Sequence, residues 1–220
     1  MGPRKQEREM EMFSEVRNIY CIGRNYRLHA LELGNEVPES PMVFTKPTHS
    51  LVPMDGHVVE LPGNQGEVHF ELELVLRVGR TLEPGMDADT CIDGLALGLD
   101  MTLRDVQSKI KAKGQPWLPA KGFKGSAPLG AWLPYPGSEE LKAHDFALLR
   151  NDEEVQHGNS ADMLFDIGTL LRHINDNYGL GPGDLIFTGT PAGVAALQDG
   201  DKLSAIWQGK EVASCTIKLV

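Results

Sequence analysis

The sequence predicts a β-rich α+β fold with a few short helices. Short apolar segments typical of strands recur from Asn18 to the end of the 220-residue chain, whereas only two or three segments have the apolar spacing of a helix. The two kinds of segment do not alternate as βαβ units require. No internal repeat or low-complexity linker divides the chain. We therefore expect one domain over residues 18–220, preceded by a charged lead-in over residues 1–17.

The first half of the chain contains most of the predicted strands. Residues 18–23, NIYCIG, have the composition of a short strand, and residues 26–33 can form about two helical turns. Gly34 would end that helix in the left-handed conformation. Further strands are predicted at 42–46, 57–61, 68–78 and from Gly94 to Thr102, with the last expected deep in a sheet and a helix following at 104–113.

The second half predicts more strands and one longer helix. A strand is expected at 145–150 with a turn at 151–153, then a helix over about 161–175 behind Ser160 as its N-cap. The last third reads as strands joined by turns at Asp199-Gly200 and Gln208-Gly209-Lys210. Those strands are expected at 184–189, 202–207 and 211–220.

Composition excludes several classes of partner. The formal net charge is -10 and the pI is about 5.1, so the chain would repel nucleic acids and anionic membranes. No apolar stretch approaches the ~20 residues of a spanning helix, and no secretory leader is visible. Three scattered cysteines without CxxC spacing argue against a disulfide framework or a zinc site. We expect a soluble, cytoplasmic protein.

Two glutamates interrupt the strand predicted at 68–78. Glu71 and Glu73 share one face with Glu67 and His69, since side chains of a strand alternate. Such alternation is the ordinary pattern of a sheet with one solvated face, and that interpretation fits the residues alone. Adjacent carboxylates are also what a bound cation requires, because the cation relieves their repulsion.

Asp100 supports the interpretation of Glu71 and Glu73 as ligands of a cation. It interrupts the apolar segment GLALGLDMTL, where burial of an unpaired carboxylate would cost several kcal/mol. A divalent ion shared with Glu71 and Glu73 would compensate it, and an all-oxygen ligand set favours Mg²⁺ or Mn²⁺ over Zn²⁺. The alternative is a salt bridge between Asp100 and Arg104.

Four ordered motifs resemble the fumarylacetoacetate hydrolase family, and its shorter acylpyruvate-hydrolysing members in particular. They are ELEL (71–74), LDMTLRDVQ (99–107), KGQPW (113–117) and FTGTPAGV (187–194). The resemblance covers the chain from Asn18 onward. It implies a single catalytic domain with the mixed β-sandwich or β-roll of that family, a homodimer, and Mg²⁺ or Mn²⁺ on Glu71, Glu73 and Asp100.

The resemblance also implies roles for other residues. His29 and Glu32 lie three apart, so one helical face presents both, and the family uses such a pair on a mobile lid to activate water. Lys121 and Gln107 are expected to stabilise negative charge on the substrate. Substrate binding is expected from Arg24, Tyr26, Arg104 and Thr190, the last largely through main-chain N–H groups of its loop, which form an anion nest.

The implied reaction is hydrolysis of a C–C bond in a small acylpyruvate, giving pyruvate and a carboxylic acid. Two alternatives use the same cation without water: decarboxylation of oxaloacetate, and isomerisation of an unsaturated 2-oxo diacid in aromatic catabolism. A relative that binds 2-oxo acids without catalysis is a further alternative. Two residues depart from the family pattern, Ala195 where GVG is usual and Lys124 where small or acidic residues are commoner. Both border the substrate rather than the metal.

Overall fold

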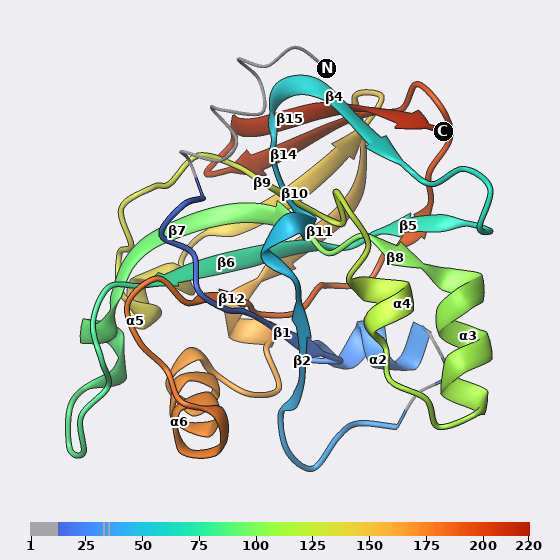
Figure 1. Ribbon diagram of the computed structural model, residues 1–220. Coiled ribbons are helices and arrows are strands. Elements are labelled where there is room, and N and C mark those ends of the chain that lie inside the picture. Colours follow the sequence, from blue (N-terminus) through green and yellow to red (C-terminus); the bar gives the residue numbers. More distant parts are fainter. Residues whose placement is uncertain (1–12, 33, 35) are drawn as a thin grey trace.

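A computed structural model describes residues 13–32, 34 and 36–220, so most of the predicted lead-in lies outside the described residues. The largest sheet has seven strands, and its inner strands come from distant parts of the chain (Figure 1). β1 pairs in parallel with β12, and β12 is antiparallel to β6. In order, the strands are β2 (Met42–Lys46), β1 (Ile19–Gly23), β12 (Leu185–Phe187), β6 (Leu72–Val78), β7 (Ile92–Leu99), β9 (Ala127–Leu129) and β3 (Leu51–Pro53).

Two smaller sheets complete the β structure. The five-stranded sheet packs on the large one through a shared apolar core that includes Leu74, Leu97, Phe146 and Leu203. Its strands are β11 (Glu153–Asn159), β10 (Asp145–Arg150), β14 (Lys202–Trp207), β15 (Lys210–Leu219) and β4 (Asp55–Leu61). The three-stranded sheet contains β13 (Ala195–Ala196), β5 (Val68–Phe70) and β8 (Thr102–Leu103). The β-rich α+β prediction is therefore confirmed.

The helices are short, and three of them gather at one end of the sheets. Figure 1 shows α2, α3 and α4 near one another, with α6 farther away. The α-helices are α2 (Arg27–Glu32), α3 (Arg104–Ala112), α4 (Leu118–Lys121), α5 (Ser138–Leu141) and α6 (Ile167–Tyr178). Single 3-10 turns lie at Thr48–Ser50, Ala88–Cys91 and Ser160–Asp162. No described helix combines the length and apolar character needed to cross a membrane.

Both faces of β6 are covered. Leu74 and Leu76 join the core between the two larger sheets. Val75, on the face that also carries Glu73, packs in a second, smaller core with Cys21 and Phe187. The solvent-face interpretation of the glutamates is therefore wrong, because this face is also apolar and buried, and Phe13, Val16 and Trp132 pack against its cluster.

The strand predicted at 68–78 is two strands, broken at Glu71. The antiparallel register runs through the break, since Asp100 N donates to Glu71 O at 2.8 Å, but Leu72 N donates to the Gln156 side chain, at Oε1, at 2.8 Å. β5 consequently joins the three-stranded sheet with β8 and β13, while β6 enters the large sheet.

The prediction of the third helix needs correction. The helix predicted over about 161–175 is α6, which begins at Ile167 with Asp166 rather than Ser160 as its N-cap. The Asp166 carboxylate accepts a hydrogen bond from Thr169 N at 2.7 Å. The preceding residues stay extended because Leu164 N donates to Asn25 O at 2.7 Å. The helices at Arg104–Ala112 and Arg27–Glu32 match their predictions, and Gly34 has the expected positive φ of 61°. All three cysteines are free and buried.

Candidate metal centre and active site

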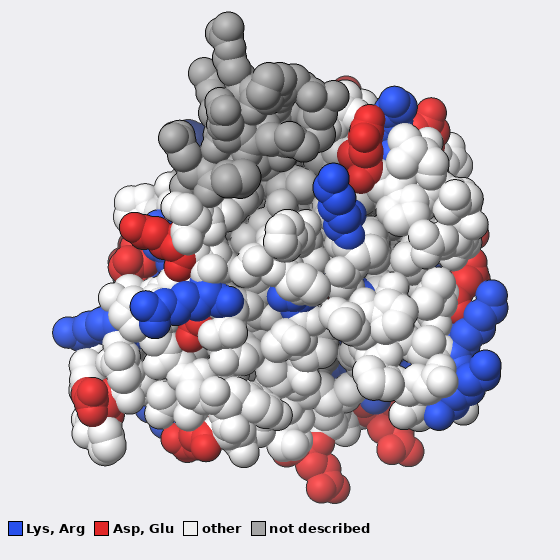
Figure 2. Space-filling view, in the orientation of Figure 1, with Lys and Arg blue, Asp and Glu red and all other residues white. Residues whose placement is uncertain are grey.

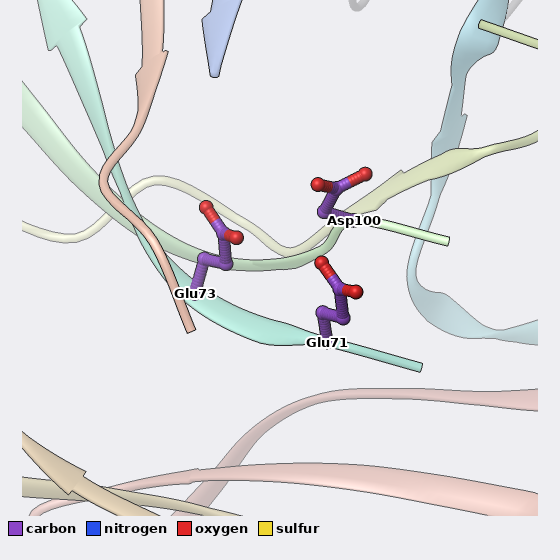
Figure 3. A group of neighbouring side chains, drawn as sticks. All are labelled: Glu71, Glu73 and Asp100. Carbon is purple, nitrogen blue, oxygen red and sulfur yellow. The ribbon is translucent and has the colours of Figure 1, made fainter. Parts of the chain in front are cut away.

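Glu71, Glu73 and Asp100 converge at the end of β6 and β7. Glu71 stands at the break before β6, Glu73 lies in β6, and Asp100 directly follows β7. Antiparallel pairing of Leu72 with Leu99 sets this register. Figure 3 shows the three carboxylates close together and extending to the same side, and one oxygen of each lies within 4.8 Å of the others. Their exposed fractions are 4%, 2% and 1%, so the predicted grouping of these acids is confirmed in a buried site.

Three cationic side chains face these acids. Lys121 Nζ lies 2.7 Å from Glu71 Oε2 and 2.6 Å from Asp100 Oδ2. Arg104 donates to Glu71 Oε1 at 2.6 Å, and Lys46 Nζ lies 2.7 Å from Asp100 Oδ1. The alternative in which Asp100 pairs with Arg104 is therefore wrong, because α3 turns Arg104 toward Glu71 and Asp100 meets two buried lysines.

Glu73 is left without a cationic contact among the described residues. It accepts one hydrogen bond, from Gly189 N at 2.8 Å. Burial first, and then the charges of Asp100 and Glu71, raise the pKa of Glu73 well above its usual range. Gly189 can approach because its φ is 100°, and a Cβ there would meet the Asn25 Cβ at 2.7 Å. A buried carboxylate in this position requires a proton or a cation.

The donor set fits a hard divalent cation. All three candidate ligands offer carboxylate oxygens, as Mg²⁺ and Mn²⁺ prefer. Asp100 Oδ1, although close to Lys46, accepts no hydrogen bond from a described residue, so it retains an acceptor position. With all three carboxylates ionised, their charge would equal that of Lys46, Lys121 and Arg104. Addition of a divalent ion would give the site excess positive charge that suits an anionic ligand.

His29 and Glu32 come together on α2 as their spacing predicts. His29 Nδ1 lies 3.6 Å from Glu32 Oε2, and the imidazole is only 5% exposed. Glu32 also accepts from Gly193 N at 3.1 and 3.2 Å, which ties α2 to the loop after β12. Burial lowers the pKa of His29, an effect that the nearby Lys121 and Arg104 reinforce and Glu71 opposes. The imidazole is therefore neutral near pH 7 and able to accept a proton.

Arg104 and Gln107 lie on one face of α3, as predicted. Arg104 donates to Gln107 Oε1 at 2.6 Å while also contacting Glu71. Despite burial, which opposes it, the carboxylates of Asp100 and Glu71 raise the pKa of Lys121, so this ammonium stays charged. One pocket brings most of the predicted residues together, and its lining includes Arg24, His29, Glu71, Asp100, Arg104, Gln107, Lys121 and Thr190.

The hydroxyl of Thr190 is already hydrogen-bonded within the protein. Its Oγ1 donates to Leu72 O at 2.8 Å and accepts from Gln156 Nε2 at 2.9 Å. Gln156 is 2% exposed and also bonds Leu72 N and Pro191 O, so it holds the break in the strand against the Thr190 loop. The hydroxyl is engaged by the protein, which leaves the main chain of the loop for the predicted anion contact.

Five of the residues that were predicted for the site or diverge from the family pattern do not line this pocket: Tyr26, Glu32, Glu73, Lys124 and Ala195. Tyr26 is 3% exposed and its hydroxyl has no hydrogen-bond partner among the described residues, so its predicted substrate contact stays a prediction. Ala195 opens β13 and pairs with Phe70. Lys124 is exposed on the surface.

The sequence did not identify Lys46 or Gln156. Lys46 is 3% exposed and donates to Met101 O at 3.2 Å and Ser126 Oγ at 3.1 Å, as well as to Lys121 O. The sequence signal for Lys46 was its position at the end of the largely apolar strand segment MVFTK. Gln156 lies in β11, a strand missed because EEVQHGN is polar; β11 is an edge strand that pairs with β10 alone.

Comparisons with known proteins agree with the site. The family model for the fumarylacetoacetate (FAA) hydrolase C-terminal region matches residues 18–218. The chain is 37% identical to the oxaloacetate tautomerase YcgM of Escherichia coli, over 90% of this chain and 92% of the relative. It is 37% identical to the mitochondrial oxaloacetate decarboxylase of Dictyostelium discoideum, with coverage of 87% and 89%.

A solved structure extends the comparison to ligands. The chain resembles the crystal structure of fumarylpyruvate hydrolase from Pseudomonas aeruginosa in complex with Mn²⁺ and pyruvate, with a TM-score of 0.85 and 33% identity. The alignment covers 93% of this chain and 91% of that one. The family therefore includes proteins named for three reactions of small 2-oxo acids.

Proposed function

The chain belongs to the fumarylacetoacetate hydrolase family, and we propose that it catalyses the keto–enol tautomerisation of oxaloacetate at the centre formed by Glu71, Glu73 and Asp100. The observation that carries the proposal is the buried imidazole of His29, 3.6 Å from Glu32 and in the same pocket as Glu71 and Asp100. The near full-length similarity to an oxaloacetate tautomerase supports this choice of substrate.

The reaction exchanges a proton on C3 for a proton on the 2-oxygen. A divalent ion held by Glu71, Glu73 and Asp100 would supply Lewis-acid polarisation of the 2-oxo group. His29 removes the C3 proton of the keto form, and the imidazolium then gives a proton to the 2-oxygen, which completes the enol and restores neutral His29; the reverse steps regenerate the ketone. Glu32, 3.6 Å from the ring, stabilises the imidazolium that His29 becomes.

Cationic and polar side chains bind the developing negative charge. Lys121 remains protonated and lies beside Glu71 and Asp100, so its charge is present throughout the proton transfer. Arg104 donates a hydrogen bond to the side-chain oxygen of Gln107, Oε1. The Gln107 Nε2 group is therefore left to donate to the substrate. Main-chain N–H groups around Thr190 are proposed to bind the carboxylate next to the 2-oxo group.

Hydrolysis of an acylpyruvate is the second candidate. The same His29–Glu32 pair could take a proton from water, and attack of that water on the distal carbonyl would release pyruvate and a carboxylic acid. The similarity to fumarylpyruvate hydrolase supports this reading. Decarboxylation of oxaloacetate needs the same charge stabilisation and no water, and one relative carries that name.

Proton NMR in D₂O separates these reactions. The protein is incubated with Mn²⁺ or Mg²⁺ and either oxaloacetate or acetylpyruvate. Tautomerisation exchanges the C3 protons of oxaloacetate for deuterium, decarboxylation gives pyruvate from oxaloacetate, and hydrolysis gives pyruvate and acetate from acetylpyruvate. We expect C3 exchange well above the rate with metal alone, its loss with EDTA, and its loss in His29→Ala. Exchange no faster than the metal-only control would refute the proposal.

A further inference from the structure

The turn between β1 and α2 contains a buried asparagine that contacts two other parts of the chain. Asn25 is fully buried and lies two residues before α2, the helix that carries His29. β1 pairs in parallel with β12, and Figure 1 shows α2 beyond the end of β1. The loop that follows β12 and begins at Thr188 therefore lies next to Asn25.

Both polar atoms of the Asn25 side chain are engaged by the main chain. Nδ2 donates to Thr188 O at 2.9 Å and to Phe165 O at 3.1 Å, and Oδ1 accepts from Phe165 N at 2.9 Å. The main-chain oxygen of Asn25 also accepts from Leu164 N at 2.7 Å. An amide side chain can donate and accept at once without a charge. Asn25 therefore fixes the loop after β12 and the segment before α6 to the turn that leads into α2.

The peptide that contains the Thr188 oxygen also contacts a proposed metal ligand. Thr188 C=O and Gly189 N–H belong to one planar group, and they point in opposite directions because the peptide is trans. Asn25 Nδ2 donates to the oxygen end, and the nitrogen end donates to Glu73 Oε2 at 2.8 Å. Any tilt of this peptide therefore changes the hydrogen bond to Glu73.

This chain of hydrogen bonds is closed to water. Asn25, Thr188 and Glu73 are all buried, whereas the charged side chains in Figure 2 lie scattered over the surface. Gly189 is packed against Asn25, since a Cβ at Gly189 would lie 2.7 Å from Asn25 Cβ. In a buried chain each hydrogen bond polarises the next. Donation from Asn25 to the peptide oxygen therefore strengthens the N–H that donates to Glu73.

We propose that Asn25 is a positioning residue of the metal centre, which holds the Glu73 carboxylate in its metal-binding orientation through the Thr188–Gly189 peptide. The inference rests on the metal centre of the proposed function and not on the reaction catalysed there. Gly189 N–H is the one hydrogen-bond donor to Glu73 among the described residues, so the orientation of this peptide decides where the carboxylate lies. Residues that orient a ligand in this way govern metal affinity without contact with the ion.

Asn25→Ala and Asn159→Ala form a matched pair for the test. The Asn159 side chain also makes three hydrogen bonds, to Lys142 O at 3.0 Å, Asp145 Oδ1 at 2.7 Å and Ala161 N at 2.8 Å. None of these partners contacts the three proposed ligands. Both variants should therefore lower Tm. Calorimetric titration with Mn²⁺, below the Tm of each variant, should show a loss of affinity of about 10–100-fold for Asn25→Ala and of less than about twofold for Asn159→Ala.

A second variant guards against a failure to fold. Asn25→Ala leaves buried main-chain groups of Thr188 and Phe165 without partners. Asn25→Ser leaves room for water and keeps a hydroxyl, but the hydroxyl is too short to replace the bond to Thr188 O. We expect Asn25→Ser to weaken Mn²⁺ binding by at least about tenfold as well.

A double-mutant cycle with Glu73→Gln distinguishes positioning from a general structural effect. If Asn25 acts through Glu73, Asn25→Ser should change Mn²⁺ affinity by less than about twofold once Glu73 is replaced, because coupled residues are not additive. Electron paramagnetic resonance of unbound Mn²⁺ measures these weaker affinities. An equal loss of affinity from Asn25→Ser in both backgrounds would show independent effects and overturn the proposal.

The remaining outcomes separate this inference from the proposed function. If the wild-type protein binds Mn²⁺ and the folded Asn25 variants bind it equally well, the inference is refuted and the proposed function stands. If Mn²⁺ affinity depends on Asn25 as expected but the protein does not exchange the C3 protons of oxaloacetate, the proposed function is refuted and the inference stands. Wild-type protein that does not bind Mn²⁺ refutes both.

Discussion

Substitution of Glu71 by glutamine tests the metal centre, and Glu67→Gln is its matched control. The two glutamates come from one segment and were predicted to share a strand face. Their side chains differ in environment: that of Glu71 is 6% exposed and that of Glu67 is 64% exposed. Glu67 contacts His69 Nε2 at 3.1 Å, whereas Glu71 accepts from both Lys121 and Arg104.

The effect on stability follows from those contacts. A glutamine keeps one acceptor oxygen but turns an NH₂ group toward the second cation. Lys121 retains Asp100 at 2.6 Å, and the side chain of Arg104 is 15% exposed and can gain water. We therefore expect a loss of about 2–3 kcal/mol in the free energy of unfolding, less than for a fully buried pair. That loss lowers Tm by about 4–12 °C in a chain of this size. Glu67→Gln should change stability by less than about 0.5 kcal/mol.

Metal binding gives the sharper contrast. Mn²⁺ at a hundredfold excess over its Kd should stabilise the wild-type protein by about 2.7 kcal/mol. Loss of a residue that only hydrogen-bonds to a metal ligand weakens metal affinity by about 10–100-fold. Loss of the Glu71 carboxylate, a proposed ligand itself, should weaken Mn²⁺ affinity by more than that. The thermal shift at the same Mn²⁺ concentration should therefore disappear. Calorimetric titration and melting curves with Mn²⁺ or EDTA measure both effects. Wild-type Mn²⁺ affinity in Glu71→Gln, or an equal loss in Glu67→Gln, would refute the reasoning.

Three further predictions address the base and the support of the site. His29→Ala should lower kcat for C3 exchange by at least about 100-fold, the usual contribution of a general base, with calorimetric Mn²⁺ affinity unchanged; a kcat close to wild type would exclude His29 as the base. Because burial lowers the pKa of His29 and the unprotonated ring is active, kcat/KM should fall only below pH 6.5 and stay level above it, and an acid limb above that value would contradict the assignment. Gln156→Leu should reduce the free energy of unfolding by about 2–3 kcal/mol, because the Leu72 N–H loses its buried partner; melting curves should show no such loss for Gln198→Leu at an exposed position.

The sequence by itself determined the local features of this protein. Gly34 after an apolar periodic segment marked the end of the helix that carries His29, and the interval of three residues placed His29 and Glu32 on one face. Asp100, a carboxylate in an otherwise apolar segment, indicated a buried charge that needs compensation. The ordered motifs then assigned the family. The inferences about Gly34, His29, Glu32 and Asp100 depend on neighbours within a few positions, and the family assignment depends on the order of short motifs over residues 71–194.

Only the tertiary structure decided what surrounds the acids. Alternation shows that Glu71 and Glu73 share a face but not what covers it, and the residues that pack there, Phe13, Val16 and Trp132, lie far away in the sequence. Likewise, Lys46 and Lys121 became the partners of Asp100 because separate segments meet there. The physical reason is that burial and electrostatics depend on distance in space: a charge is compensated by the groups that folding brings within a few ångströms, and local sequence patterns do not specify those groups.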